Sequence, residues 1–100
     1  MSERSYPGLL DDRDGGLTDF GRTVMDARVF GFIPETETCA GWEVGRLQGL
    51  ADQVSRAWAP YRGLPSLLPD AQRDLHGRIY AEAISRARAA GWDPELRDED

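Results

Sequence analysis

The segment from Asp70 to Gly91 constrains the fold most, because its apolar residues recur every three or four positions. That spacing places them on one stripe of an α-helix and does not match the alternation of a half-buried strand. Pro69 suits the first turn of a helix, Gly91 suits its left-handed end, and Pro94 blocks any continuation. The sequence therefore predicts a helix over residues 70–90 with one buried face.

Two further helices are predicted upstream of this segment. One covers residues 18–32, where Thr18 is placed to cap the start and Pro34 to end the helix. The other covers residues 42–59, whose apolar residues again follow a helical period. One hundred residues are enough for a single hydrophobic core. We therefore expect an all-α fold, a small three-helix bundle over residues 17–94.

The two ends of the chain are poor in apolar residues. Residues 1–16 close with a run of aspartates and glycines, so we expect a flexible arm there. Tyr6, Leu9 and Leu10 are its apolar exceptions, and an alternative is that they dock on a partner or on the domain itself. Residues 95–100 are predicted to be a short acidic tail.

Charge and composition exclude several classes of function. The chain carries a formal net charge of −6, with 18 acidic residues against 12 basic ones. Nucleic-acid binding needs a basic patch, so we expect no nucleic-acid partner. There is no apolar run near the length of a membrane span and no secretory signal, and one cysteine allows no internal disulfide. We expect a cytoplasmic protein that does not bind membranes.

Catalytic chemistry has few candidate residues, since the chain contains one histidine and one cysteine. No phosphate-binding loop, dinucleotide fingerprint, cysteine-pair zinc pattern or calcium loop is present in the sequence. We therefore expect a protein that is not an enzyme and has no resident metal or cofactor.

The first two predicted helices carry more apolar and aromatic residues than one buried stripe needs. In the first helix and just after it, a second apolar row is either central core or an uncovered contact surface. In and around the second helix, aromatic and arginine residues resemble the composition of protein interfaces. The predicted contact residues are Met25, Val29, Phe32, Ile33, Trp42, Arg46, Trp58 and Tyr61. The leading hypothesis is an accessory or regulatory protein that binds a larger cytoplasmic protein or enzyme complex, with homo-oligomerisation left open.

A competing hypothesis is a metal-binding or redox-sensing site. Cys39 lies just ahead of the second helix, and His76 lies in the third. Two ligands would leave a metal undercoordinated, so Glu35, Glu37 or a partner would have to complete the site. Cys39 is otherwise a small, partly buried thiol, and His76 a hydrogen-bonded residue at the edge of the core.

Three glycines, Gly41, Gly45 and Gly49, recur at spacing four along the start of the second helix. Each glycine in a helix interior costs about 1 kcal/mol relative to alanine, so the row requires a reason. One is the close approach of another backbone. The other is that the helix begins late, between Trp42 and Gly49.

Overall fold

The computed structural model of the chain describes residues 5–12, 15–89 and 91. Three α-helices follow one another, α1 (Asp19–Val29), α2 (Val44–Trp58) and α3 (Asp70–Ala89). Short 3-10 turns precede α1 and connect α2 to α3 (η2, Leu9–Asp11; η3, Ala59–Tyr61; η4, Pro65–Leu67). Within the described ranges no strand forms, and one isolated bridge pairs Ser5 with Glu43. The predicted all-α fold with three helices is confirmed.

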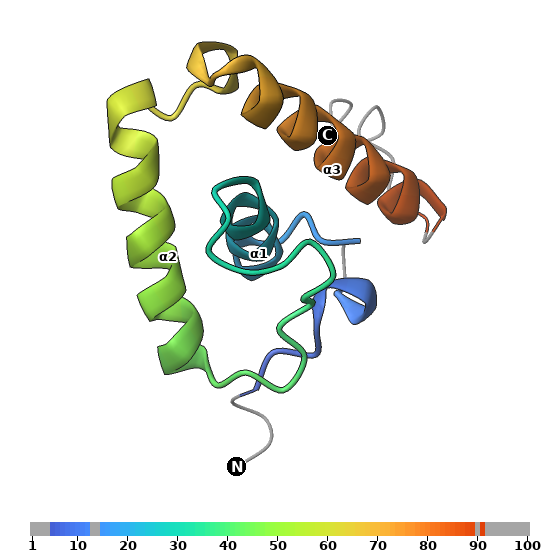
Figure 1. Cartoon of the computed structure of the whole chain (residues 1–100). Helices are drawn as coiled ribbons and strands as arrows, with labels where there is room; N and C mark the ends of the chain where they lie inside the picture. The colour runs from blue at the N-terminus through green and yellow to red at the C-terminus, as the bar shows by residue number, and fades with distance from the viewer. Residues whose placement is uncertain (1–4, 13–14, 90, 92–100) are drawn as a thin grey trace, which may run out of the picture.

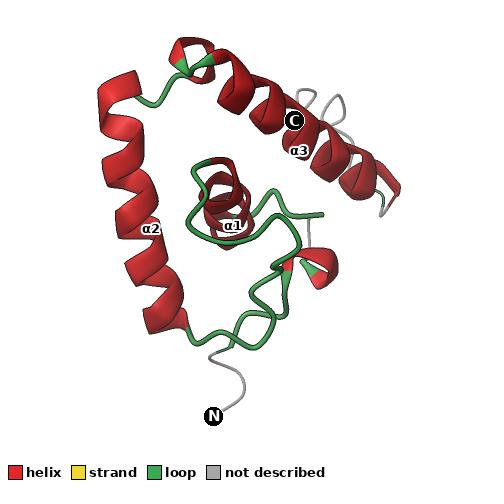
Figure 2. Ribbon diagram, viewed as in Figure 1, coloured by secondary structure: helices red, strands yellow, loops and turns green. Residues whose placement is uncertain are grey.

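α1 occupies the middle of the molecule. It lies between α2 on one side and α3 on the other, and it packs against both (Figures 1 and 2). The loop from α1 to α2 and the N-terminal segment run side by side beneath α1, linked by backbone hydrogen bonds. Because α1 is covered from several directions, more than one of its faces is buried.

The start of α1 follows the prediction, but its end comes earlier. The Thr18 hydroxyl accepts a hydrogen bond from Gly21 N–H at 3.1 Å, as a capping threonine does. Gly31 then adopts φ 78°, and Phe32 N–H donates to the Ala27 carbonyl at 2.9 Å. This is the Schellman pattern that terminates a helix. The helix therefore stops at Val29, before Pro34 is reached, and the chain after Gly31 is redirected across α2.

Over residues 5–12 the N-terminal segment packs against the helical domain, which is the alternative that the sequence left open for Tyr6 and Leu9. Tyr6 and Leu9 are buried in the core, and Tyr6 N–H donates to the Trp42 carbonyl at 2.9 Å. Leu10 is exposed. Two apolar side chains inserted between helices thus hold a segment whose average composition is polar. The expected acidic tail at 95–100 lies outside the described residues.

Three glycines let this segment pass between the helices at backbone contact. A Cβ added at Gly21 of α1 would lie 2.3 Å from the Gly16 carbonyl oxygen. One added at Gly15 would lie 2.5 Å from the Ala87 nitrogen of α3. We call Gly15, Gly16 and Gly21 the glycine crossing. At Gly15 and Gly21 backbone atoms of the neighbouring element occupy the space of a Cβ, whereas at Gly16 the nearest atom is Leu9 Cδ1 at 2.8 Å.

An aspartate of α1 links the three helices through hydrogen bonds. Asp26 accepts from Trp58 Nε1–H at 3.1 Å and from the Tyr80 hydroxyl at 2.7 Å. The two donors come from the end of α2 and the middle of α3. Asp26 thereby satisfies the polar atoms of two largely apolar side chains and fixes how α2 and α3 sit on α1.

Candidate functional site

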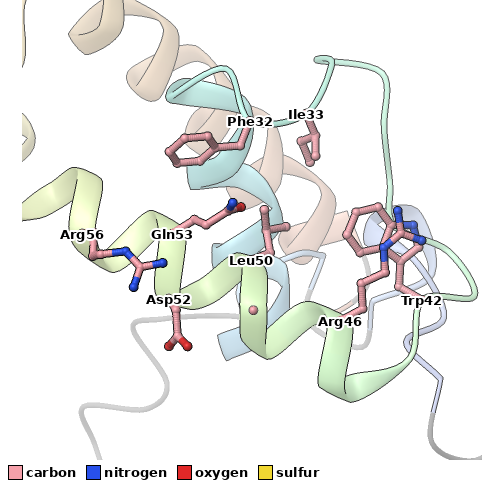
Figure 3. A pocket seen from close by; sticks show the side chains of 9 residues that line it. Phe32, Ile33, Trp42, Arg46, Leu50, Asp52, Gln53 and Arg56 are labelled. Carbon is pink, nitrogen blue, oxygen red and sulfur yellow. The ribbon is translucent and has the colours of Figure 1, made fainter.

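An open groove of about 420 Å³ runs along α2 beneath the turn that follows α1 (Figure 3). α2 forms its floor and one wall, and the residues after Gly31 form the other wall. The groove is lined by Phe32, Ile33, Trp42, Arg46, Gly49, Leu50, Asp52, Gln53 and Arg56. Four of the eight predicted contact residues therefore share one surface, namely Phe32, Ile33, Trp42 and Arg46.

The early end of α1 creates the upper wall. Since Gly31 reverses the chain, Phe32 and Ile33 leave the helical path and lie over α2 instead of continuing the stripe of α1 (Figure 3). Phe32 remains 43% exposed, although it is a large apolar side chain. A large aromatic side chain left this accessible at a groove is typical of a contact surface.

At one end of the groove, Arg46 stacks on Trp42. The guanidinium carbon lies 3.6 Å from the centroid of the indole ring, a cation–π geometry. Trp42 is itself held by the hydrogen bond from Tyr6 N–H to its carbonyl. In the described part of the chain no carboxylate pairs with Arg46, whose side chain is exposed. Arg46 is thus oriented by stacking while its N–H donors stay available.

The floor of the groove is bare helix backbone. Gly49 lines it, and a Cβ added at Gly49 or at Gly45 would meet no atom within 4 Å. α2 begins at Val44, so Gly41 precedes the helix and the late start explains that one glycine. Gly45 and Gly49 lie inside the helix, and no other backbone of the described chain approaches them. The packing of residues 5–12, 15–89 and 91 therefore does not explain why these two positions are glycine.

For Met25 and Val29 the prediction of a surface contact is wrong, because both side chains lie in the core. Met25 is fully buried, and Val29 is 4% exposed. Both apolar rows of α1 are covered because α1 lies between α2 and α3, with the N-terminal segment beneath it. Of the two alternatives left open by the sequence, central core applies to Met25 and Val29, whereas Phe32 and Ile33 border the groove.

Trp58 and Tyr61 belong to a different cluster. The ring of Phe30 lies 5.1 Å from that of Trp58 in a T-shaped arrangement and 6.4 Å from that of Tyr61 in a stacked one. Trp58 also donates to Asp26. These half-buried rings close the end of the core where α2 meets α3, and they do not line the groove.

His76 is packed among the same aromatic side chains. Its ring stacks on Tyr80 at 4.3 Å and meets Trp58 edge-on at 6.0 Å. Burial lowers the pKa of His76, an effect that the carboxylate of Asp26 opposes. His76 is therefore a neutral edge-of-core residue at physiological pH.

Cys39 has other neighbours. It is buried, with φ 60°, and its backbone N–H donates to Glu37 Oε2 at 2.9 Å. Burial raises the pKa of its thiol to about 11, and the charge of Glu37 adds to that effect. A thiol with this pKa stays protonated at neutral pH and is a poor nucleophile or metal ligand.

The competing metal or redox site is therefore not assembled. Glu35 forms an ion pair with Arg78 at 2.9 Å, and the ring of His76 stacks on that of Tyr80, so each has another partner than Cys39. Among the described residues no three side chains of metal-binding type come together.

No family model, curated protein or solved structure matches this chain. In the described ranges, no helix is both long and apolar enough to cross a membrane.

Several residues that line the groove were not among the predicted contacts. They are Gly49, Leu50, Asp52 and Gln53, whereas Arg56 belongs to the arginine and aromatic residues expected around the second helix. The glycine row at spacing four was the available signal, since it marks a helix face without side chains. What the sequence alone does not reveal is that this face lies opposite Phe32 and Ile33.

Proposed function

We propose that this chain is a non-catalytic accessory or regulatory protein that binds a larger protein through the groove on α2. The observation that carries this proposal is the combination, on one accessible surface, of an exposed Phe32, an Arg46 stacked on Trp42 and an uncovered backbone at Gly49. Aromatic and arginine side chains contribute most of the binding energy in many protein interfaces.

The chemistry of the lining supports binding over turnover. The nine residues that line the groove include no serine, threonine, cysteine, histidine or tyrosine, and Asp52 is the single carboxylate. A nucleophile paired with a base, or two carboxylates sharing a substrate, would be the minimum for most hydrolytic chemistry. Apolar walls with a few polar side chains at the edges are instead typical of a docking surface.

We place this activity in the cytoplasm. The chain contains a single cysteine, and Cys39 is buried with a protonated thiol, so its fold uses no disulfide. Such a protein is suited to a reducing compartment.

Site-specific photo-crosslinking in the host cell tests the proposal. A benzophenone amino acid replaces Gln53, an exposed residue of the groove, in the full-length chain. We expect irradiation to join the chain to one larger protein in a defined ratio. The matched control carries the same group at Ser85, which is exposed on α3. The proposal is wrong if Gln53 gives no protein adduct, or if both positions give the same adducts.

A further inference from the structure

The exposed face of α2 offers a second helix an unusually close approach. Gly45 and Gly49 lie four residues apart, which is roughly 6 Å along a helix. Apart from the backbone of α2 itself, no atom of the described residues lies within 4 Å of the position that a Cβ would take at either glycine. Packed helices normally lie about 8–10 Å apart, depending on the side chains at the contact. Glycine removes that side chain, so a partner helix can lie directly on the backbone of α2.

The groove also has a charge pattern. Arg46 and Arg56 are both exposed and lie ten positions apart, roughly 15 Å along the helix. Over the described residues neither forms an ion pair, and Asp52 is the only acid in the lining. The groove therefore carries a net positive charge in a chain whose formal net charge is −6. This local reversal of sign favours an acidic partner segment.

Stacking on Trp42 orients the guanidinium of Arg46 to bind a carboxylate. Its guanidinium is already stacked on the Trp42 ring at 3.6 Å, so less side-chain freedom is lost when it binds. Guanidinium and carboxylate groups match in a two-pronged hydrogen-bonded pair. Leu50 and Ile33 lie between this position and Phe32, which lies nearer Gln53 (Figure 3).

From these observations we infer that the groove binds an amphipathic α-helix of the partner protein, with an Asp or Glu opposite Arg46. This inference rests on the proposed function and specifies its partner. The apolar stripe of that helix packs on Phe32, Ile33 and Leu50, and its backbone crosses α2 at Gly49. An extended peptide fits less well, because the backbone amides of α2 are used within the helix and offer no sheet edge for pairing.

A peptide selection tests the inference. A library of random 16-residue peptides is selected by mRNA display on the full-length protein. Binding of the selected peptides is then compared with their binding to the Gly49→Gln variant. Glutamine fills the open space but suits a helix better than glycine, so the fold is kept. We expect enriched peptides with apolar residues at i, i+3 or i+4, and i+7, and with an acidic residue on one flank. Their affinity is expected to fall at least tenfold for Gly49→Gln.

The acidic contact is tested by charge exchange. Arg46→Glu should weaken the enriched peptides at least tenfold, and replacing their acidic residue by lysine should restore binding to that variant. The matched control, Arg88→Glu, makes the same change at an exposed position of α3 and should leave affinity unchanged. Enriched peptides that lack the helical apolar period or the acidic residue would overturn the inference, as would equal binding to Gly49→Gln.

Two other results would also overturn the inference, namely binding in the groove of this chain's own C-terminal residues or of a second copy of the chain. Residues 92–100 combine Trp92 and Leu96 with several acids, so a synthetic peptide of that sequence is titrated against the protein. Binding that Arg46→Glu abolishes would assign the groove to this chain's own segment. A dimer in sedimentation experiments that Gly49→Gln abolishes would assign it to a second copy. If crosslinks form at Gln53 but the selected peptides have other chemistry, the proposed function stands and this inference fails.

Discussion

Glycines occur in two contrasting settings in this molecule. At the glycine crossing, an added Cβ at Gly21 would lie 2.3 Å from the Gly16 carbonyl oxygen. On the outer face of α2, an added Cβ at Gly45 or Gly49 would meet no atom within 4 Å. We call the glycine crossing the closed site, because other parts of the chain fill the space of a side chain there. We call the face with Gly45 and Gly49 the open site, because that space is empty among the described residues.

The difference shows which glycines the fold requires. At Gly15 and Gly21 of the crossing, any side chain would displace backbone atoms, so glycine stabilises the fold by permitting the contact. On α2, each glycine destabilises the helix by about 1 kcal/mol relative to alanine and permits no contact with any other described part of the chain. The loss of helix stability at an open glycine is therefore not offset by packing within the fold. Binding of a partner at this face would explain why glycine is present.

Filling the closed site should have the largest effect. Gly21→Ala places a methyl group where the Gly16 carbonyl oxygen lies, and the backbone has to move apart. Overpacking of this kind costs about 3 kcal/mol or more when backbone atoms are the obstacle. Urea unfolding followed by circular dichroism measures it. A change near zero would mean that the crossing is loose, and the contrast with α2 would be lost.

The thiol of Cys39 is another buried group, and its pKa reports that burial. Burial raises it to about 11 from an ordinary 9.0, so the folded state holds the proton more tightly than the unfolded state. The stabilising contribution is complete below pH 9.0 and is lost as pH rises through about 11. A shift of two pKa units lowers the thiolate fraction roughly a hundredfold at pH 8.

We therefore expect a disulfide reagent at pH 8 to label Cys39 roughly a hundredfold more slowly in the folded protein than in urea. A small peptide thiol supplies the reference rate in both solutions. Rapid labelling of the folded state would place Cys39 at an accessible surface and would revive the redox hypothesis.

Two aspartates show the same contrast between the interior and the groove, since Asp26 accepts two hydrogen bonds between the helices and Asp52 is exposed. Asp26→Ala leaves Trp58 N–H and the Tyr80 hydroxyl without their acceptor, at a cost of about 2 kcal/mol. Asp52→Ala, at an exposed position of the groove, should change the free energy of unfolding by less than about 0.5 kcal/mol. Chemical unfolding of both variants decides this. Equal losses would indicate that the two faces are not energetically distinct.

Filling the open site should have a small effect of the opposite sign. Gly49→Ala adds a methyl group to open space and improves helix propensity, so stability should rise by about 0.5–1 kcal/mol. Thermal unfolding beside Gly21→Ala gives a matched pair of identical chemical changes. A loss of stability in Gly49→Ala would mean that a contact within the chain uses this glycine.

The local features of the fold were predictable from sequence because they depend on neighbouring residues. The cap at Thr18 was predicted and is present, as is the positive φ of Gly91. The end of α1 was misplaced, since Pro34 was read as the terminator although Gly31 acts first. Both glycine and proline can end a helix, and the sequence pattern alone does not show which of Gly31 and Pro34 ends α1.

The candidate site was predictable only in part. Phe32, Ile33, Trp42 and Arg46 were expected to contact a partner, and all four line the groove. Met25 was chosen for the same reason as Phe32 but lies in the core. Helical spacing identifies an apolar row, but it does not say whether another element covers that row.

The sequence by itself determined the three helices and their order, because apolar period, caps and helix-ending residues act within a few positions. Only the tertiary structure decided which faces are covered. It placed α1 in the middle, inserted Tyr6 and Leu9 into the core, and left Gly49 bare on α2. Burial depends on contacts between residues far apart in the chain. Whether a glycine is a packing requirement or an open surface is therefore settled by what lies opposite it.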